Sequence, residues 1–256
     1  MHKHLFSVLL LAVLLAGCAS TPDDELDDAD ADKTAAILYN EANDSLHAGD
    51  YETAISRLES LEARFPFGRY AQQAQLDIAY AYYKYDEPDS AVSALDRFIK
   101  LYPRHPRVDY AYYLRGLVKF EQGRGVFDNL PGQDPAKRDP GAAKQAFQFF
   151  DDLVSHYPNS IYAADAVERM RYLRNSLARY EIYVGEYYFR RGAYLAAANR
   201  GKQVLEYFGT TPSVPDALVL MIKSYEKLQL PDLAADAQRV LKKNFPKHKT
   251  ELAALQ

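Results

Sequence analysis

The sequence is poor in the residues from which reactive centres and disulfide-stabilised folds are built. It contains one cysteine, Cys18, so the chain has no partner for an internal disulfide. None of its six histidines lies four residues from another plausible ligand with a third in evidence, as a metal site on a helix requires. There is no Gly-x-Ser-x-Gly motif, and the glycine pair Gly123 and Gly125 does not follow a strand, as a phosphate-binding loop must. We therefore expect no cofactor, no metal and no catalytic residue, and a protein that is not an enzyme.

The sequence also lacks an apolar run long enough to cross a membrane. The longest, Leu5 to Leu15, is shorter than the roughly 20 residues that a transmembrane helix needs, and it follows a short polar segment that contains Lys3. This pattern predicts a cleaved export signal over residues 1–17. The run ends in Leu15-Ala16-Gly17-Cys18, which matches the bacterial lipobox, so we expect Cys18 to be acylated and to become the mature N-terminus. The alternative is an ordinary secretory signal followed by an accidental cysteine.

Acidic residues are concentrated just after the cysteine. Seven of them fall between Asp23 and Asp32, with almost no apolar residue among them. Such a segment cannot bury enough surface to fold, which predicts a disordered tether over residues 18–33. A calcium site is a weaker alternative, because the glycine and the distal glutamate of an EF-hand loop are missing. The rest of the chain is nearly neutral, which argues against nucleic acid as a partner.

An alanine followed twelve residues later by a proline recurs along the chain, and an aromatic residue precedes each proline. We interpret the alanine as the point where two antiparallel helices approach closely, and the proline as the end of a unit. A degenerate fifth copy begins at Ala197 and has Gly209 in place of the proline. The four complete copies are Ala54 to Pro66, Ala91 to Pro103, Ala146 to Pro158, and Ala234 to Pro246.

This spacing resembles the tetratricopeptide repeat (TPR). It predicts an all-α fold, an α-solenoid of five TPR-like helix-turn-helix repeats wound into a right-handed superhelix over residues 34–246. The third repeat is 18 residues too long, and the excess predicts an inserted loop over residues 123–140, rich in glycine and proline. Residues 247–256 are left as a C-terminal tail. The repeats are expected at about 34–66, 67–103, 104–158, 159–211 and 212–246.

Several longer strings are similar to the BamD (ComL) family of lipoproteins in the β-barrel assembly (BAM) machine. The resemblance covers residues 18–246. Other TPR lipoproteins are not expected to share both the third-repeat insertion and these strings. The strings include Arg64-Phe65-Pro66-Phe67-Gly68, Ile78-Ala79-Tyr80-Ala81-Tyr82-Tyr83-Lys84, Tyr157-Pro158-Asn159-Ser160 and Leu177-Ala178-Arg179-Tyr180-Glu181.

The resemblance implies a scaffold lipoprotein on the periplasmic side of the outer membrane. Its first repeats are expected to receive the β-signal of unfolded outer-membrane proteins, on an aromatic surface made by Phe65, Phe67, Tyr70, Tyr80 and Tyr83. Its last repeats are expected to dock the periplasmic domain of BamA, and other BAM lipoproteins to attach at its sides. The residues expected at the BamA contact are Arg190, Arg191, Asn199 and Arg200. The alternative function is that of another periplasmic TPR lipoprotein adaptor, in pilus biogenesis or cell division.

Overall fold

The chain folds into five helical hairpins. The computed structural model describes residues 28–124 and 139–248, and over these two ranges it contains ten helices and no strand. The expected all-α architecture of five helix-turn-helix repeats is therefore confirmed. The hairpins are α2 (Asp28–Ala48) with α3 (Tyr51–Arg64), α4 (Arg69–Lys84) with α5 (Pro88–Leu101), α6 (Val108–Arg124) with α7 (Gly141–His156), α8 (Ala163–Arg190) with α9 (Tyr194–Tyr207), and α10 (Val214–Lys227) with α11 (Pro231–Asn244).

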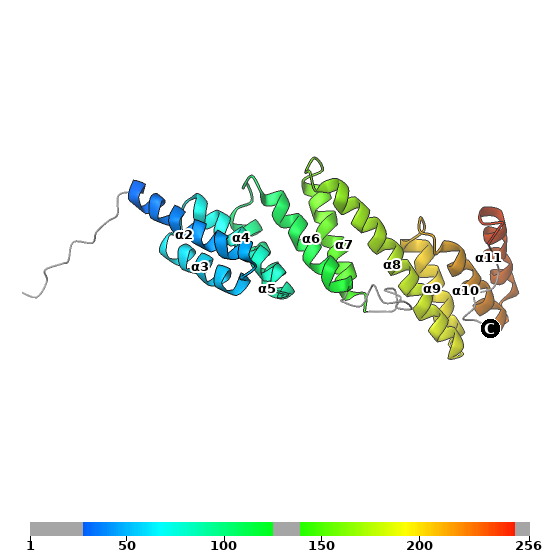
Figure 1. Cartoon of the computed structure of the whole chain (residues 1–256). Coiled ribbons are helices and arrows are strands. Elements are labelled where there is room, and N and C mark those ends of the chain that lie inside the picture. The colour runs from blue at the N-terminus through cyan, green and yellow to red at the C-terminus, as the bar shows by residue number, and fades with distance from the viewer. Residues whose placement is uncertain (1–27, 125–138, 249–256) are drawn as a thin grey trace, which may run out of the picture.

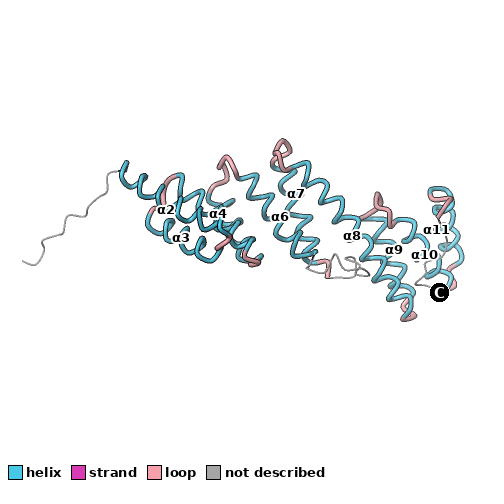
Figure 2. The backbone as a smooth tube through the Cα atoms, in the orientation of Figure 1, coloured by secondary structure: helices cyan, strands magenta, loops and turns pink. Residues whose placement is uncertain are grey.

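The hairpins follow one another along an elongated molecule, with α2 at one end and α11 at the other (Figure 1). Each helix packs against the helices next to it in sequence, and the first helices of neighbouring hairpins also touch, as α2 does with α4 and α8 with α10. The loops drawn in pink between the helices are short (Figure 2), and residues 125–138 between α6 and α7 lie outside the described residues. A hairpin in this arrangement buries its apolar face only because the next hairpin covers it.

Four of the hairpin turns share one backbone geometry. One or two residues after the end of the first helix, φ is positive, 78° at Gly49 and 76° at Gly192, as expected where glycine ends a helix. Asp86 and Gln229 occupy the same position in their own hairpins, with φ of 62° and 58°. In each turn the next amide donates to a carbonyl five residues back, for example Asp50 to Ser45 at 3.0 Å. A second bond runs from the Gly49 amide to the Leu46 carbonyl at 3.1 Å. These two bonds form the Schellman motif, which ends the helix and reverses the chain.

The second helix of each hairpin ends on an aromatic residue. At Phe65, φ is −132° and the amide donates to the Leu61 carbonyl at 2.8 Å, so the ring turns back onto the hairpin's own core. The aromatic residue of the twelve-residue motif is therefore a repeated C-cap that packs into the core between hairpins. All five of these caps are half-buried: Phe65, Tyr102, Tyr157, Phe208 and Phe245.

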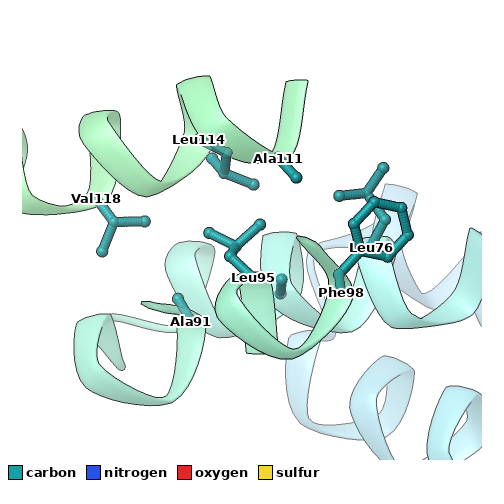
Figure 3. Close-up of a cluster of buried hydrophobic side chains, with 8 residues drawn as sticks. Leu76, Ala91, Leu95, Phe98, Ala111, Leu114 and Val118 are labelled. Carbon is teal, nitrogen blue, oxygen red and sulfur yellow. The ribbon is translucent and has the colours of Figure 1, made fainter. Parts of the chain in front are cut away.

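Small residues lie where the helices approach most closely, as the repeat predicts. Ala54, Ala91 and Ala146 are fully buried, and a β-carbon built on Gly116 would lie 2.6 Å from the Phe150 ring. Larger apolar side chains fill the space around these contacts. Figure 3 shows one such cluster, in which α4, α5 and α6 contribute Leu76, Ala91, Leu95, Phe98, Ala111, Leu114 and Val118.

Two predicted boundaries need correction. Helix α2 begins at Asp28, so the last six residues of the predicted tether, 28–33, are helical. The helix dipole favours negative charge at a helix N-terminus, which explains why an acidic run can start a helix. The helix α6 continues to Arg124, two residues into the predicted insertion. Residues 1–27, with the predicted signal and Cys18, 125–138 of the insertion, and 249–256 of the tail lie outside the described residues.

Helix α8 is one unbroken helix of 28 residues, and no proline lies between Asn159 and Arg190 to interrupt it. Within the described ranges, no helix is both long and apolar enough to be a membrane span.

Candidate functional site

The first helices of the first four hairpins are linked to one another by tyrosine–carboxylate hydrogen bonds. In each case a hydroxyl on one first helix donates to a carboxylate on the next. The surface along which α2, α4, α6 and α8 are joined in this way is called the first-helix face below. The bonds run from Tyr39 to Asp77 (2.6 Å), from Tyr83 to Glu121 (2.6 Å) and from Tyr113 to Asp165 (2.7 Å).

Aromatic rings lie alongside these bonds and make a row across the same helices. The row begins with Tyr39 and Tyr70, whose ring centroids are 5.5 Å apart, and continues with Tyr80 and Tyr83 at 6.2 Å. Tyr162 at the start of α8 lies 5.5 Å from Tyr110 and stacks on Tyr113 at 4.8 Å. The row ends near Tyr172, 5.8 Å from Phe120. Such a surface offers flat apolar rings whose polar tips are already held in place.

The carboxylates under this row differ in their electrostatic environments. Burial raises the pKa of Asp77 above its usual value, although hydrogen bonds from Tyr39 and Gln73 oppose the shift. Partial burial also acts to raise the pKa of Asp165, but hydrogen bonds from Arg169 and Tyr113 outweigh it and hold that pKa below its usual value. Burial raises the pKa of Tyr110 to about 12. Burial is also the main cause that raises the pKa of Tyr39, Tyr83 and Tyr113, so these three hydroxyls keep their protons at neutral pH and donate to the carboxylates.

The five residues predicted to bind substrate do not form one cluster. Tyr70 packs with Phe65 against the core between the first two hairpins, whereas Tyr80 and Tyr83 pack against the core between the second and third. Phe65 is the C-cap of α3, and its half-buried ring packs against the same core cluster as Tyr70. Phe67 is 91% exposed, in the loop between α3 and α4, and belongs to neither core cluster.

The residues predicted to dock a partner lie on the hairpin of α8 and α9. Arg190, Arg191 and Asn199 are exposed, and Arg191 lies over the Tyr187 ring at 5.4 Å. Two apolar side chains are exposed beside them, Tyr187 and Leu195.

Arg200 is placed differently from its three predicted companions. It is half-buried, and its Nη1 donates to the Glu181 carboxylate of α8 at 2.7 Å. The guanidinium also lies 5.8 Å from the centre of the Tyr188 ring. A bidentate pair between this guanidinium and a partner's carboxylate must therefore compete with a contact inside the chain.

Sequence reasoning missed most of the aromatic row, including Tyr39, Tyr110 and Tyr162, and the carboxylates Asp77 and Asp165. One signal could have found two of the bonds. Tyr39 and Asp77 are 38 residues apart, as are Tyr83 and Glu121, and the repeat is about 37 residues long. Residues one repeat apart lie side by side on neighbouring first helices. Among the described residues, no group of three or more histidine, cysteine or acidic side chains is placed to hold a metal ion.

Solved structures with a similar arrangement of helices are only distantly related in sequence. The crystal structure of MamA is 18% identical, with a TM-score of 0.40, covering 86% of this chain and 97% of that one. The TPR domain of P58(IPK) is 14% identical, with a TM-score of 0.44, covering 87% of this chain and 54% of that one.

Sequence relatives are much closer. A protein of Neisseria meningitidis named outer membrane protein assembly factor BamD is 45% identical over 96% of this chain and 92% of the relative. The protein of the same name in Vibrio cholerae is 37% identical over 95% of this chain and 99% of the relative. The family model YfiO, described as outer membrane lipoprotein, matches residues 31–241. The chain therefore belongs to the outer membrane lipoprotein (YfiO) family, together with the assembly factors named BamD.

Proposed function

We propose that this chain is a lipid-anchored, non-catalytic assembly factor for outer-membrane proteins. The names of its relatives support this function directly, since they are outer membrane protein assembly factors over nearly the whole length of the chain. Family membership favours this function over an adaptor role in pilus biogenesis or cell division. The anchor is the acylated Cys18, and the protein faces the periplasm from the outer membrane.

In this proposal the first-helix face receives the β-signal of an unfolded client. The observation that carries it is the row of rings from Tyr39 to Tyr172 along α2, α4, α6 and α8. A β-signal alternates apolar residues and ends in an aromatic one, so it can lay rings on rings in an extended conformation. Tyr70, Tyr80 and Tyr83 are the predicted residues that belong to this surface, while Phe65 packs against the core of the first two hairpins.

The fourth hairpin is the proposed docking site for BamA. Arg190 and Arg191 place two positive charges at the end of α8. The Tyr187 ring and the Leu195 side chain are exposed on the same hairpin. An apolar centre with arginine at its border is the composition of a typical protein interface. Other BAM lipoproteins are proposed to attach along the sides of the solenoid.

Photo-crosslinking tests the client surface. A photo-reactive phenylalanine analogue replaces Tyr70 or Tyr80 in the full chain, and the matched control replaces Tyr207, an aromatic residue that is 67% exposed at the end of α9. We expect a β-signal peptide to crosslink at Tyr70 and Tyr80 and not at Tyr207. Strong crosslinks at Tyr207 alone would place the client site in the last hairpins and overturn the assignment.

A further inference from the structure

Basic residues gather at the two connections that follow the first and second hairpins. Arg64 and Arg69 flank the first connection, 65–68, and Arg104 and Arg107 lie in the second, 102–107, just after Lys100 in the last turn of α5. The connections that follow the third and fourth hairpins, 157–162 and 208–213, have no charged residue. The first two connections therefore differ from the next two in their positive charge.

These two loops lie side by side. Gln72, at the start of α4, borders a groove of about 340 Å³ whose other wall is Leu101 to Pro106. The Tyr102 hydroxyl accepts from the amide of Gln75 in α4 at 3.5 Å. We call this surface the arginine edge and define it by the exposed residues Arg64, Phe67, Arg69, Arg104 and Arg107.

Phe67 is the most exposed large apolar side chain of the described residues. It stands between Arg64 and Arg69, each of which lies over the ring of a neighbouring aromatic residue, Phe65 at 5.7 Å and Tyr70 at 4.7 Å. Leu101, on the second loop, is also more than half exposed. Apolar and aromatic side chains bordered by arginine are the composition of segments that lie in a membrane interface.

The arginine edge belongs to the hairpins that follow the proposed anchor in the chain. Ten peptide units separate Cys18 from Asp28, where α2 begins, and at full extension they span at most about 35 Å. Ala35, early in α2, packs in the same core cluster as Phe65 and Tyr70, which lie on either side of Phe67. Acyl chains at Cys18 would therefore keep the start of α2, and the core beside the edge, within reach of the bilayer surface.

We propose that the arginine edge rests on an anionic phospholipid surface, with Phe67 inserted among the headgroups. This inference depends on the proposed acylation of Cys18, which raises the local concentration of the edge at the membrane. Each arginine near an anionic surface strengthens the contact roughly fivefold, and salt weakens it. The contact orients the solenoid, because an anchor at a single point limits where the solenoid can lie but does not fix which way its axis points.

The absence of tryptophan from the chain allows a sharp test. Phe67→Trp places a single tryptophan at the edge, and Tyr207→Trp places one at another exposed aromatic position, at the end of α9 next to the uncharged loop 208–213. Acylated full-length chains are reconstituted into phosphatidylcholine vesicles with or without phosphatidylglycerol, using lipids with brominated acyl chains as quenchers. We expect the Phe67→Trp fluorescence to shift to the blue and to be quenched only when phosphatidylglycerol is present. The Tyr207→Trp signal should not change.

Further variants identify the occupant of the edge. Arg64→Glu with Arg104→Glu, added to Phe67→Trp, should abolish the quenching while flotation with the vesicles persists through the acyl anchor. Equal quenching in both reporters, or quenching without phosphatidylglycerol, would overturn the proposal. So would a Phe67→Trp signal that responds to a β-signal peptide or to neutralisation of the acids between Asp23 and Asp32, and not to vesicles. Loss of flotation in the parent chain would instead show that the anchor itself is wrong.

Discussion

The carboxylate of Glu181 and the guanidinium of Arg200 form an ion pair that joins α8 to α9, with 2.7 Å between Oε2 and Nη1. Glu181 is buried, with only 8% of its surface exposed. The pair closes the fourth hairpin beside Gly185, where a β-carbon would come within 3.2 Å of the Arg200 Cβ. Arg200 therefore holds the hairpin together, whether or not it also contacts a partner.

Replacing Arg200 should lower stability before it affects binding. Arg200→Ala leaves the buried Glu181 without its ion-pair partner, which we expect to reduce the free energy of unfolding by about 1–3 kcal/mol. Arg200→Glu should cost more, because it places two carboxylates together. Urea unfolding measures both, and Arg190→Ala, at an exposed position of the same hairpin, is the control and should change stability little.

The charge-swapped double variant separates the structural role of Arg200 from a docking role. Glu181→Arg combined with Arg200→Glu should recover most of the stability lost by Arg200→Glu. If it also recovers binding to BamA, Arg200 acts only through the fold. If stability returns and binding does not, Arg200 touches the partner. A double variant no more stable than Arg200→Glu would show that the pair does not stabilise the hairpin.

Asp77 should make the first two hairpins less stable as pH rises. Burial raises its folded-state pKa, so the folded chain keeps a proton that the unfolded chain has already released. The free energy of unfolding then falls from about pH 4, the usual pKa of an aspartate, up to the raised folded-state value. The side chain of Asp77→Asn cannot titrate. The free energy of unfolding of the wild type minus that of the variant, measured by urea titration, should therefore become smaller as pH rises through that window. A difference that is constant or increases with pH would contradict this assignment.

Two glycines in the same helix should respond in opposite ways to alanine. Gly116→Ala places its methyl group 2.6 Å from the buried Phe150 ring, and we expect overpacking to cost about 1–3 kcal/mol. Gly123→Ala meets nothing nearer than 3.6 Å and should stabilise α6 by up to about 1 kcal/mol, because glycine is the poorer helix former. Thermal unfolding checks both. Adding Phe150→Leu should relieve the clash of Gly116→Ala, and a failure to do so would place the strain elsewhere.

Acylation of Cys18 should be the membrane anchor. Cys18→Ala behind a cleavable signal should yield a periplasmic protein that salt removes from membranes, because the arginine edge alone binds weakly and electrostatically. Fractionation at low and high salt, followed by mass spectrometry of the mature N-terminus, measures this. Cys18→Ala protein that still sediments with outer membranes at high salt would reveal a second attachment.

The repeat could be predicted from the sequence because its signals are local. Ala54 and Pro66 mark a close helix contact and a helix end within one hairpin, and both follow from the size and backbone of the residue itself. The pairing of Tyr39 with Asp77 has no such local signal. Their spacing of 38 residues, close to the repeat length, places them on neighbouring first helices, but which side chains meet there depends on the core packing between the hairpins.

Residue type alone leaves three features of the structure out. The sequence suggests a surface position for Phe65, but its backbone ends α3 and turns the ring onto the core. The family resemblance assigns Arg200 to a partner contact, which stays a prediction, and it does not indicate the ion pair with Glu181, 19 residues earlier in the same chain. The acidic run before Thr34 suggests disorder throughout, although α2 begins at Asp28 and negative charge favours the start of a helix.

Helix α8 belongs to two neighbourhoods at once. Its first half packs with α6 and α7 through Ala166 and Leu173, and its second half lies against α9 and α10 through Ala178 and Ile182. It is a stiff rod on the order of 40 Å long, with Tyr162 of the aromatic row beside one end and Arg190 at the other. A tilt of one degree about one end moves the other by about 0.7 Å. A force on the proposed client surface near Tyr162 can therefore displace Arg190, at the proposed BamA contact, without any refolding of α8.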